Sequence, residues 1–325
     1  MKKYLIIALL IPLLSSCSKD DIRENEGIVN EENLNILTSI NELAIDTFIP
    51  KKGLALSNDE DIDQNTNPKL KSDNKDELKK NIESWLGENP KAKWVYDNFD
   101  DLDNIDAYLA GNDEDTIEFV YNMNNGLTNF PYTPGQSVDL ERKTPYFIQW
   151  DNRWAYNKLG NRNIGISGCG PTSMAMILSR LKKDNSITPD KIAKDAQNYM
   201  GNEGISWNFF YDGAKKYDYK IEEVALNEEA MKKALEKGPL LVSVNKGYFT
   251  LFGHIFVIDS YKDGKFIIND PNSLRNSKIE WTFDQISNQI IKIWSIYWLD
   301  KTIMVLYNRK VFFSAISSVG RAPDS

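Results

Sequence analysis

The spacing of apolar residues changes once along this chain, near Gly238-Pro239. Before that point apolar residues recur at helical intervals, and after it they form short runs that are typical of buried strands. Two of these runs are separated by Asp263-Gly264, a pair that favours a tight hairpin turn. The sequence therefore predicts an α+β fold, in which helices come first and an antiparallel sheet follows.

The expected boundaries rest on capping residues and helix breakers. Thr188 followed by Pro189 predicts one helix start, Asn227 predicts another, and Gly238 ends the helix that Asn227 begins. The expected helices are 171–182, 189–199, 206–216 and 228–237, and the expected strands are 240–244, 255–261, 266–269 and 293–298.

The first residues predict an exported protein. Lys2-Lys3 precedes an apolar run over residues 4–14, which is too short to span a bilayer as a helix. The run ends in Leu14-Ser15-Ser16-Cys17, which resembles the bacterial lipobox, where cleavage precedes the cysteine and its thiol carries lipid. We expect a signal peptide over residues 1–16 and an extracytoplasmic protein that a lipid on Cys17 anchors to a bacterial membrane, at the cell surface. An ordinary secretory signal with an incidental cysteine is the alternative.

Four segments follow the predicted signal. Residues 17–75 are rich in Asn, Asp, Glu and Lys and predict a flexible acidic tether. Residues 76–139 carry short helical patterns, and residues 140–300 contain the α+β pattern described above. The remaining tail, residues 301–325, fits that pattern poorly, and its last ten residues resemble translated read-through into a neighbouring structural-RNA gene.

Composition argues against several functional classes. Asp and Glu number 47 against 39 Lys and Arg, and an acidic chain with a pI near 5.0 is a poor candidate for nucleic-acid binding. Two cysteines and one histidine cannot form a disulfide framework, and they cannot complete a structural zinc site without carboxylates. We therefore expect no metal, no organic cofactor and no nucleic-acid partner, while the oligomeric state is left open.

Lipidation of Cys17 leaves Cys169 as the one free thiol, in a compartment where an exposed thiol is easily oxidised. In Gly168-Cys169-Gly170-Pro171-Thr172 the thiol lies at the expected start of a helix, where the helix dipole and free N–H groups favour a thiolate. The flanking glycines are expected to let a substrate approach closely. A buried cysteine that packs as a small apolar residue is the alternative, which these glycine neighbours do not favour.

A nucleophilic cysteine needs a base, and His254 is the only histidine in the chain. Taken alone, a histidine at the start of a strand is more often structural than catalytic. Folding the hairpin about residue 263 brings Asp270 within a position or two of residues 254–256, where a carboxylate can orient the imidazole. The strand register stays open, and a turn residue before Pro271 is the alternative role for Asp270.

An oxyanion formed at this thiol needs hydrogen-bond donors. The backbone N–H of Cys169 is one candidate, and the side chain of Gln149 is the other. Spacing alone does not select Gln149, because a polar residue between aromatics is also typical of a strand edge.

Four ordered segments resemble the C39-like branch of papain-like cysteine peptidases: PYFIQWDNRWAYNKLG, ISGCGPTSMAMIL, GHIFVI and FIINDPN, within residues 140–298. The resemblance implies a papain-like fold in which Cys169 is the nucleophile, His254 the base, Asp270 its orienting partner and Gln149 an oxyanion donor. The best-known members cut leader peptides after a double glycine and are fused to an ABC transporter. This sequence shows no transporter segment and no nucleotide-binding motif, so the resemblance does not carry that substrate over.

The implied activity is hydrolysis of a peptide or amide bond through a thioester acyl-enzyme, with a peptide or protein as the substrate. Two alternatives stay open: a surface lipoprotein that uses the scaffold only for binding, and a transglutaminase-like acyl transfer in which an amine replaces water. Trp150, Trp154 and Trp207 are candidates for the walls of a substrate groove, although core packing is the commoner role of tryptophan.

Overall fold

The computed structural model describes residues 66–202 and 204–298. The predicted signal peptide, Cys17 and the tail over residues 301–325 lie outside the described residues. The same is true of the predicted tether, apart from its last ten residues.

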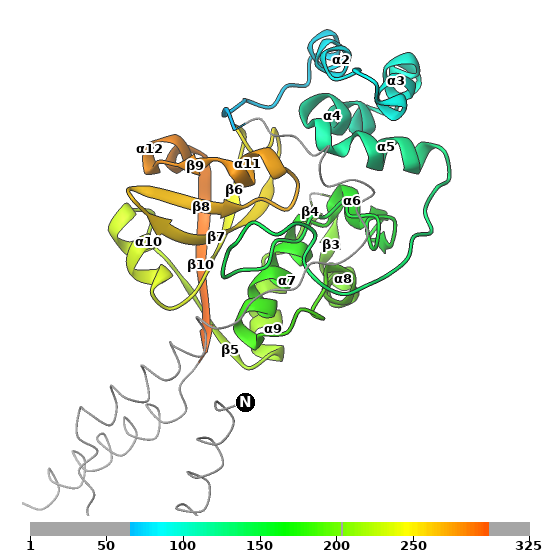
Figure 1. The fold of residues 1–325 in the computed structure, drawn as a ribbon. Coiled ribbons are helices and arrows are strands. Elements are labelled where there is room, and N and C mark those ends of the chain that lie inside the picture. Colours follow the sequence, from blue (N-terminus) through cyan, green and yellow to red (C-terminus); the bar gives the residue numbers. More distant parts are fainter. Residues whose placement is uncertain (1–65, 203, 299–325) are drawn as a thin grey trace, which may run out of the picture. The chain divides into compact units, whose positions relative to one another are not determined.

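A six-stranded antiparallel sheet lies at the centre of the described domain (Figure 1). All four expected strands are present, and the predicted α+β class is confirmed. The apolar pattern does not predict β5 and β9, because these edge strands contain no apolar run. In the order in which they pair, the strands are β5 (Tyr219–Glu223), β10 (Ile290–Trp298), β6 (Leu240–Val244), β7 (His254–Lys262), β8 (Lys265–Asn269) and β9 (Glu280–Trp281).

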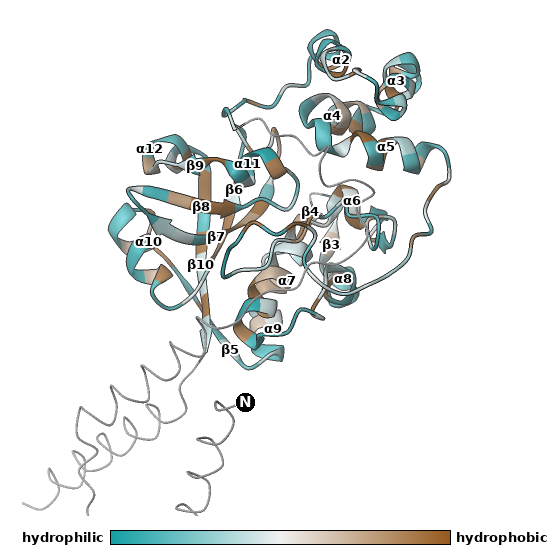
Figure 2. Cartoon of the chain, in the orientation of Figure 1, coloured by the Kyte–Doolittle hydropathy of each residue, from teal (hydrophilic) through white to brown (hydrophobic). Residues whose placement is uncertain are grey.

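Helices cover both faces of this sheet. Leu241 and Val257 belong to the apolar cluster of α7 (Cys169–Lys182), whereas the neighbouring Leu240 and Phe256 belong to the cluster of α10 (Glu228–Leu235). Successive side chains of a strand point to opposite faces, so β6 is buried at every position, and it is apolar at every position except Ser243. Figure 2 accordingly shows hydrophobic residues on the central strands and hydrophilic residues on the outer helices.

Side-chain caps explain only some of the helix starts. Asn227 accepts the N–H of Ala230 and caps α10 as predicted. Thr188 precedes α8 (Pro189–Ala196), but its hydroxyl does not cap that helix and instead lies 2.7 Å from the hydroxyl of Tyr132. The remaining helices of this region are α6 (Ile164–Ser167), α9 (Asn208–Lys216), α11 (Leu274–Lys278) and α12 (Phe283–Ile286).

The first four α-helices of the described chain are α2 (Lys75–Ser84), α3 (Pro90–Asp97), α4 (Asn104–Asn112) and α5 (Ile117–Asn124). Their buried apolar residues belong to the same cluster as those of α7, so these helices share one core with the sheet domain. The expected helical region extended to residue 139, but residues 126–139 contain no helix, because Gly126, Pro131 and Pro134 break the pattern. We call residues 66–125 the N-terminal module.

Residues 66–74, which we call the strap, differ from the expected tether. Part of the strap packs on the domain. The Lys71 side chain is buried and pairs with Asp113, and the backbone N–H of Lys71 donates to the carbonyl of Gly247 at 3.2 Å. The backbone of Ser72 exchanges two hydrogen bonds of 2.9 Å with the Asn112 side chain. Polar composition predicts solvation, but these polar groups are satisfied by other parts of the protein.

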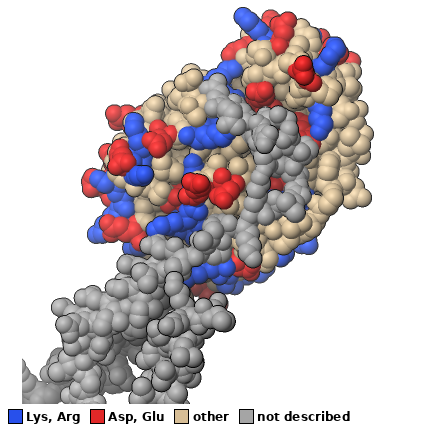
Figure 3. Space-filling model, in the orientation of Figure 1, with Lys and Arg blue, Asp and Glu red and all other residues tan. Residues whose placement is uncertain are grey.

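Two short hairpins complete the described structure, one formed by β1 (Lys158–Leu159) and β2 (Arg162–Asn163), the other by β3 (Met200–Gly201) and β4 (Gly204–Ile205). Within residues 66–202 and 204–298, no helix has the length and apolar character needed to cross a membrane. On the face visible in Figure 3, acidic and basic side chains are interspersed.

Candidate active site

Cys169 is the first residue of α7, and it is a free, partly exposed cysteine. The N–H of Gly168 donates to the carbonyl of Ile164 at 2.8 Å, and a Cβ atom on Gly168 would collide with that carbonyl. A Cβ atom on Gly170 would lie 2.9 Å from the side chain of Ile205. The two glycines are thus required by the packing of α7 against α6 and β4, and their expected role in letting a substrate approach stays a prediction.

His254 and Asp270 come from the two strands of the predicted hairpin. β7 begins at His254, and β8 ends one residue before Asp270. Val257 pairs with Asn269, which settles the register that the sequence left open. In this register Nε2 of His254 lies 2.7 Å from Oδ1 of Asp270, so the structure brings the imidazole and the carboxylate together.

The Asp270 carboxylate is fully buried and is held by several donors. Oδ1 also accepts the backbone N–H of Asn272, and Oδ2 accepts the amide of Asn276, both at 2.9 Å. The backbone N–H of Asp270 donates to the hydroxyl of Ser277 at 2.8 Å. Sequence reasoning missed Asn276 and Ser277, because the polar run over residues 272–277 is typical of an exposed loop and no spacing distinguishes these two residues.

Electrostatics favour a charged imidazole at neutral pH. Burial lowers the pKa of His254, but the Asp270 charge and hydrogen bond outweigh burial and raise that pKa to about 10. Burial likewise raises the pKa of Asp270, but the charge of His254 and the hydrogen bonds from His254, Asn276 and Asn272 bring it below its usual value. Both pKa shifts favour the imidazolium–carboxylate form of the pair.

The thiol of Cys169 completes the cluster. A hydrogen bond between Cys169 and His254 contributes to the raised pKa of the imidazole. Because Nε2 of His254 is engaged by Asp270, Nδ1 is the ring nitrogen left for the thiol. Three side chains from α7, β7 and the end of β8 thus meet in the order thiol, imidazole, carboxylate.

Gln149 lies between the two halves of this site. Its backbone N–H donates to the carbonyl of Pro271, and its Nε2 donates to the carbonyl of Gly165, both at 2.8 Å. Pro271 follows Asp270, and Gly165 belongs to the helix before Cys169, so Gln149 bridges the segments that carry the carboxylate and the thiol. A side-chain amide has two N–H groups, which leaves one N–H of Gln149 beyond the bond to Gly165.

The three tryptophans differ in exposure. Trp150 and Trp154 are buried, and their indole N–H groups donate to the carbonyls of Asn272 and Ile148, so both are core residues and do not line a groove. Trp207 is 37% exposed and packs edge-on against Trp294, and its role in a groove stays a prediction.

Among the residues that the structure describes, no group of three or more His, Cys, Asp or Glu side chains is arranged to hold a metal ion.

Comparisons with known proteins identify one family and several similar solved structures. Residues 141–298 match the model of the Peptidase_C39 like family. One similar solved structure is a double glycine motif protease from an AMS/PCAT transporter in complex with the leader peptide, with 21% identity over 40% of this chain and 81% of that chain and a TM-score of 0.30. Another is the peptidase domain of Streptococcus ComA, a bi-functional ABC transporter involved in a quorum-sensing pathway, with 15% identity over 44% of this chain and 99% of that chain and a TM-score of 0.33. No curated protein matches the chain.

The family match covers the four motifs that carry the sequence resemblance, from the segment with Gln149 to the segment with Asp270. It also covers α7 and every strand of the central sheet. The predicted resemblance is therefore confirmed. Residues 141–298 of this chain form a domain that belongs to the Peptidase_C39 like family.

Proposed function

We propose that this protein is a membrane-anchored, extracytoplasmic cysteine peptidase that hydrolyses peptide or amide bonds. The observation that carries the proposal is the meeting of Cys169, at the start of α7, with a His254 imidazole that is bonded to Asp270 at 2.7 Å. An imidazolium next to a thiol favours the thiolate, which is the nucleophilic form of cysteine. The first seventeen residues support the anchored location, because they resemble a lipobox.

In the proposed mechanism the Cys169 thiolate attacks the carbonyl carbon of the scissile amide. The oxyanion accepts hydrogen bonds from the backbone N–H of Cys169 and from the second N–H of Gln149. His254 donates its proton to the leaving amine as the C–N bond breaks, which leaves a thioester on Cys169. Water, deprotonated by His254, then attacks the thioester, the C–S bond breaks, the acid product leaves, and the thiolate–imidazolium pair is regenerated. Asp270 keeps the imidazole oriented throughout.

The experiment measures alkylation of Cys169 by iodoacetamide at pH 6. A Cys17→Ser background makes Cys169 the only thiol in the chain. An ordinary thiol, with a pKa of about 8.5, is less than ~1% ionised at this pH and reacts slowly. We expect Cys169 to react at least about tenfold faster with His254 present than in His254→Ala. Cys169→Ala is the control for labelling at other sites.

A reactive thiol that depends on His254 then justifies a peptide-library screen, in which cleavage must disappear in Cys169→Ala. If Cys169 is unreactive, or if its alkylation rate is the same in His254→Ala as with His254 present, the peptidase proposal is overturned in favour of a binding module. Addition of a labelled amine distinguishes the two fates of the thioester. Hydrolysis gives a free acid, whereas incorporation of the amine into the product would contradict hydrolysis and indicate acyl transfer.

A further inference from the structure

The N-terminal module lies outside the family match, but it makes buried polar contacts with the segment that follows Asp270. The hydroxyl of Ser273 donates to Oδ1 of Asp113 at 2.8 Å, and the N–H of Leu274 donates to Oδ2 of Asp115 at 3.0 Å. Arg275 donates to the carbonyl of Asn112 at 3.2 Å. Three successive residues at the start of α11 are therefore held by residues 112–115, at and just after the end of α4.

Ser273 connects this contact to the start of α11. Its hydroxyl oxygen accepts the N–H of Asn276 and so caps the helix. A hydroxyl has only one hydrogen, and because that hydrogen goes to Asp113, the oxygen is available as an acceptor for the cap. The carboxylate of Asp113 thus fixes the orientation in which Ser273 begins α11.

α11 in turn holds Asp270. Asn276 donates to the Asp270 carboxylate, and Ser277 accepts the Asp270 backbone N–H. A continuous series of hydrogen bonds therefore runs from Asp113 through Ser273 and α11 to Asp270, and from Asp270 to His254. Every link is buried, so water does not readily replace a missing partner.

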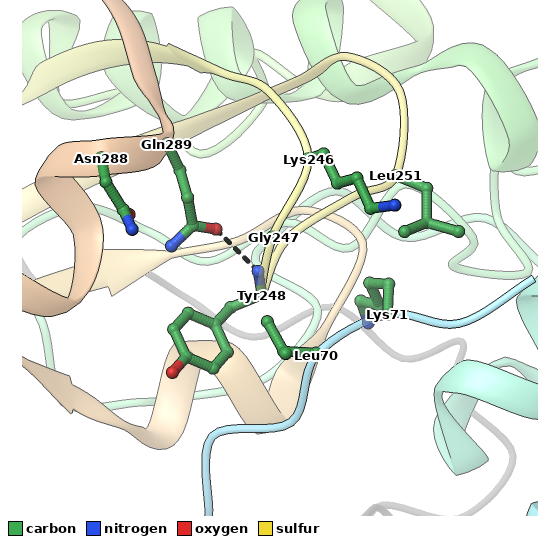
Figure 4. Close-up of a pocket in the computed structure, with 8 residues that line it drawn as sticks. All are labelled: Leu70, Lys71, Lys246, Gly247, Tyr248, Leu251, Asn288 and Gln289. Atoms are coloured by element: carbon green, nitrogen blue, oxygen red, sulfur yellow. Dashed lines mark hydrogen bonds between the residues drawn. The ribbon is translucent and has the colours of Figure 1, made fainter.

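The module also contacts the loop that leads into His254. The strap donates to the carbonyl of Gly247, and Figure 4 shows Leu70 and Lys71 beside Gly247 and Tyr248. Tyr108 of α4 hydrogen-bonds to Thr250 and to the backbone of Leu251. Both segments that carry the imidazole–carboxylate pair are therefore braced by residues outside the family match.

We infer that Asp113 and Asp115 are positioning residues for the His254–Asp270 pair, which they hold in place through Ser273, Leu274 and α11. The inference rests on the proposed function, because positioning has a catalytic consequence only where the pair serves Cys169. It makes residues 66–298 the functional unit of this peptidase, since the 141–298 domain alone lacks Asp113 and Asp115, which contact the start of α11.

The experiment uses the single histidine of the chain as a reporter. His254 is the only source of imidazole signals, so NMR of the full-length protein labelled with ¹³C-histidine follows its titration without any assignment step. A less well oriented Asp270 interacts more weakly with the imidazole and lowers the midpoint. We expect a midpoint near 10 in the wild type, and a midpoint lower by at least about one unit in Asp113→Asn and in Ser273→Ala. Alkylation of Cys169 at pH 6 should fall at least about fivefold in both variants.

Asp97→Asn is the matched control, because Asp97 lies in the same module, is half exposed and pairs with Lys93 of the same helix at 2.7 Å. Its titration midpoint and alkylation rate should equal those of the wild type. Asp113 also pairs with the buried Lys71, so Asp113→Asn risks unfolding. Ser273→Ala and Asp115→Ala leave that ion pair intact and decide the question if Asp113→Asn does not fold.

The two proposals fail in different ways. If the wild-type midpoint is near the ordinary value of about 6.5 and Cys169 is unreactive, the proposed function fails. If the wild type behaves as expected and folded Ser273→Ala and Asp115→Ala keep its midpoint and reactivity, only the positioning inference is overturned. Non-additive effects of Asp113→Asn and Ser273→Ala in the double variant would support their action through one shared contact.

Discussion

At the scale of single residues, burial acts differently on two carboxylates of this protein. Asp270 is fully buried, but a charged imidazole and several donors keep its pKa low. Asp106 on α4 is also buried, and its carboxylate accepts a hydrogen bond from the side chain of Asn124 at 2.8 Å. Burial, together with the charge of Asp103, raises the pKa of Asp106 to about 6, against the Asn124 bond and Arg162. The difference lies in the partners and not in the depth of burial.

We predict that Asp106→Asn stabilises the protein at pH 7. The folded-state pKa of Asp106 lies above its unfolded value, so the folded form binds the proton more tightly. Its contribution to stability is therefore greatest below pH 4, falls as the pH rises from about 4 to 6, and is a penalty above pH 6. After allowance for solvent screening, removal of the charge should raise the free energy of unfolding by about 1 kcal/mol at pH 7.

Urea unfolding at pH 4 and pH 7 measures this effect. Asp101→Asn, a change of the same kind at an exposed position of the module, should leave stability nearly unchanged at both values. A variant that is equally stable relative to the wild type at pH 4 and pH 7 would contradict the assignment of the raised pKa to Asp106.

The sequence allowed a prediction of the reactive residues more readily than of the residues around them. Cys169 and His254 stand out because they are scarce, and Asp270 follows from the geometry of one hairpin. Spacing did not select Gln149, which entered through the family resemblance. Asn276 and Asp113 were missed, because a polar residue becomes a buried donor or acceptor only when distant segments pack together.

At the scale of elements, the packing of α5 on α6 connects the N-terminal module with the start of the cysteine helix. A Cβ atom on Gly165 of α6 would overlap the ring of Phe119, which belongs to α5. The carbonyl of Gly165 accepts the Gln149 side chain, and the next helix begins at Cys169. The close approach of two helices is thus coupled to the position of the candidate oxyanion donor.

We predict that Gly165→Ala destabilises the protein, although alanine is the better helix former. The overlap with a buried ring should cost about 1–3 kcal/mol, which outweighs the gain of up to about 1 kcal/mol in helix propensity. Displacement of α6 should also lower the alkylation rate of Cys169. Phe119→Leu removes ring atoms from the overlap, so the double variant should recover part of both losses.

Gly213→Ala on α9 is the matched control, because its added Cβ atom would meet only the flexible end of Met174, at 3.2 Å. Thermal unfolding should show a neutral or slightly stabilising effect there. A Gly165→Ala variant as stable and as reactive as Gly213→Ala would show that α5 and α6 are not packed as described.

The elements that were predicted share a strong local signal. β6, β7, β8 and β10 contain apolar runs, and the hairpin between β7 and β8 contains Asp263-Gly264. α6, α11 and α12 have four or five residues, which is too short for a helical period to appear in the sequence. The packed strap was missed for a different reason: its polar residues are satisfied by Asn112, Asp113 and Gly247, which no local pattern reveals.

At the scale of the whole molecule, the described domain and the first residues of the chain suggest separate tasks. Residues 17–75 contain thirteen acidic and seven basic residues, so this segment has no electrostatic attraction to an anionic membrane. Under the proposed function, the lipid that Cys17 is expected to carry attaches the protein to the membrane.

We predict that Cys17→Ser releases the protein from the membrane without affecting Cys169. Each buried CH₂ group of an acyl chain contributes about 0.8 kcal/mol to membrane binding, so loss of the lipid removes most of the affinity. In bacterial cells fed a clickable palmitate analogue, the wild type should be labelled and partition into the detergent phase of Triton X-114. Cys17→Ser should be unlabelled and partition into the aqueous phase. Cys169→Ser changes the other cysteine of the chain in the same way and should behave like the wild type. Labelling of Cys17→Ser, or its retention in the detergent phase, would show that another part of the chain anchors the protein.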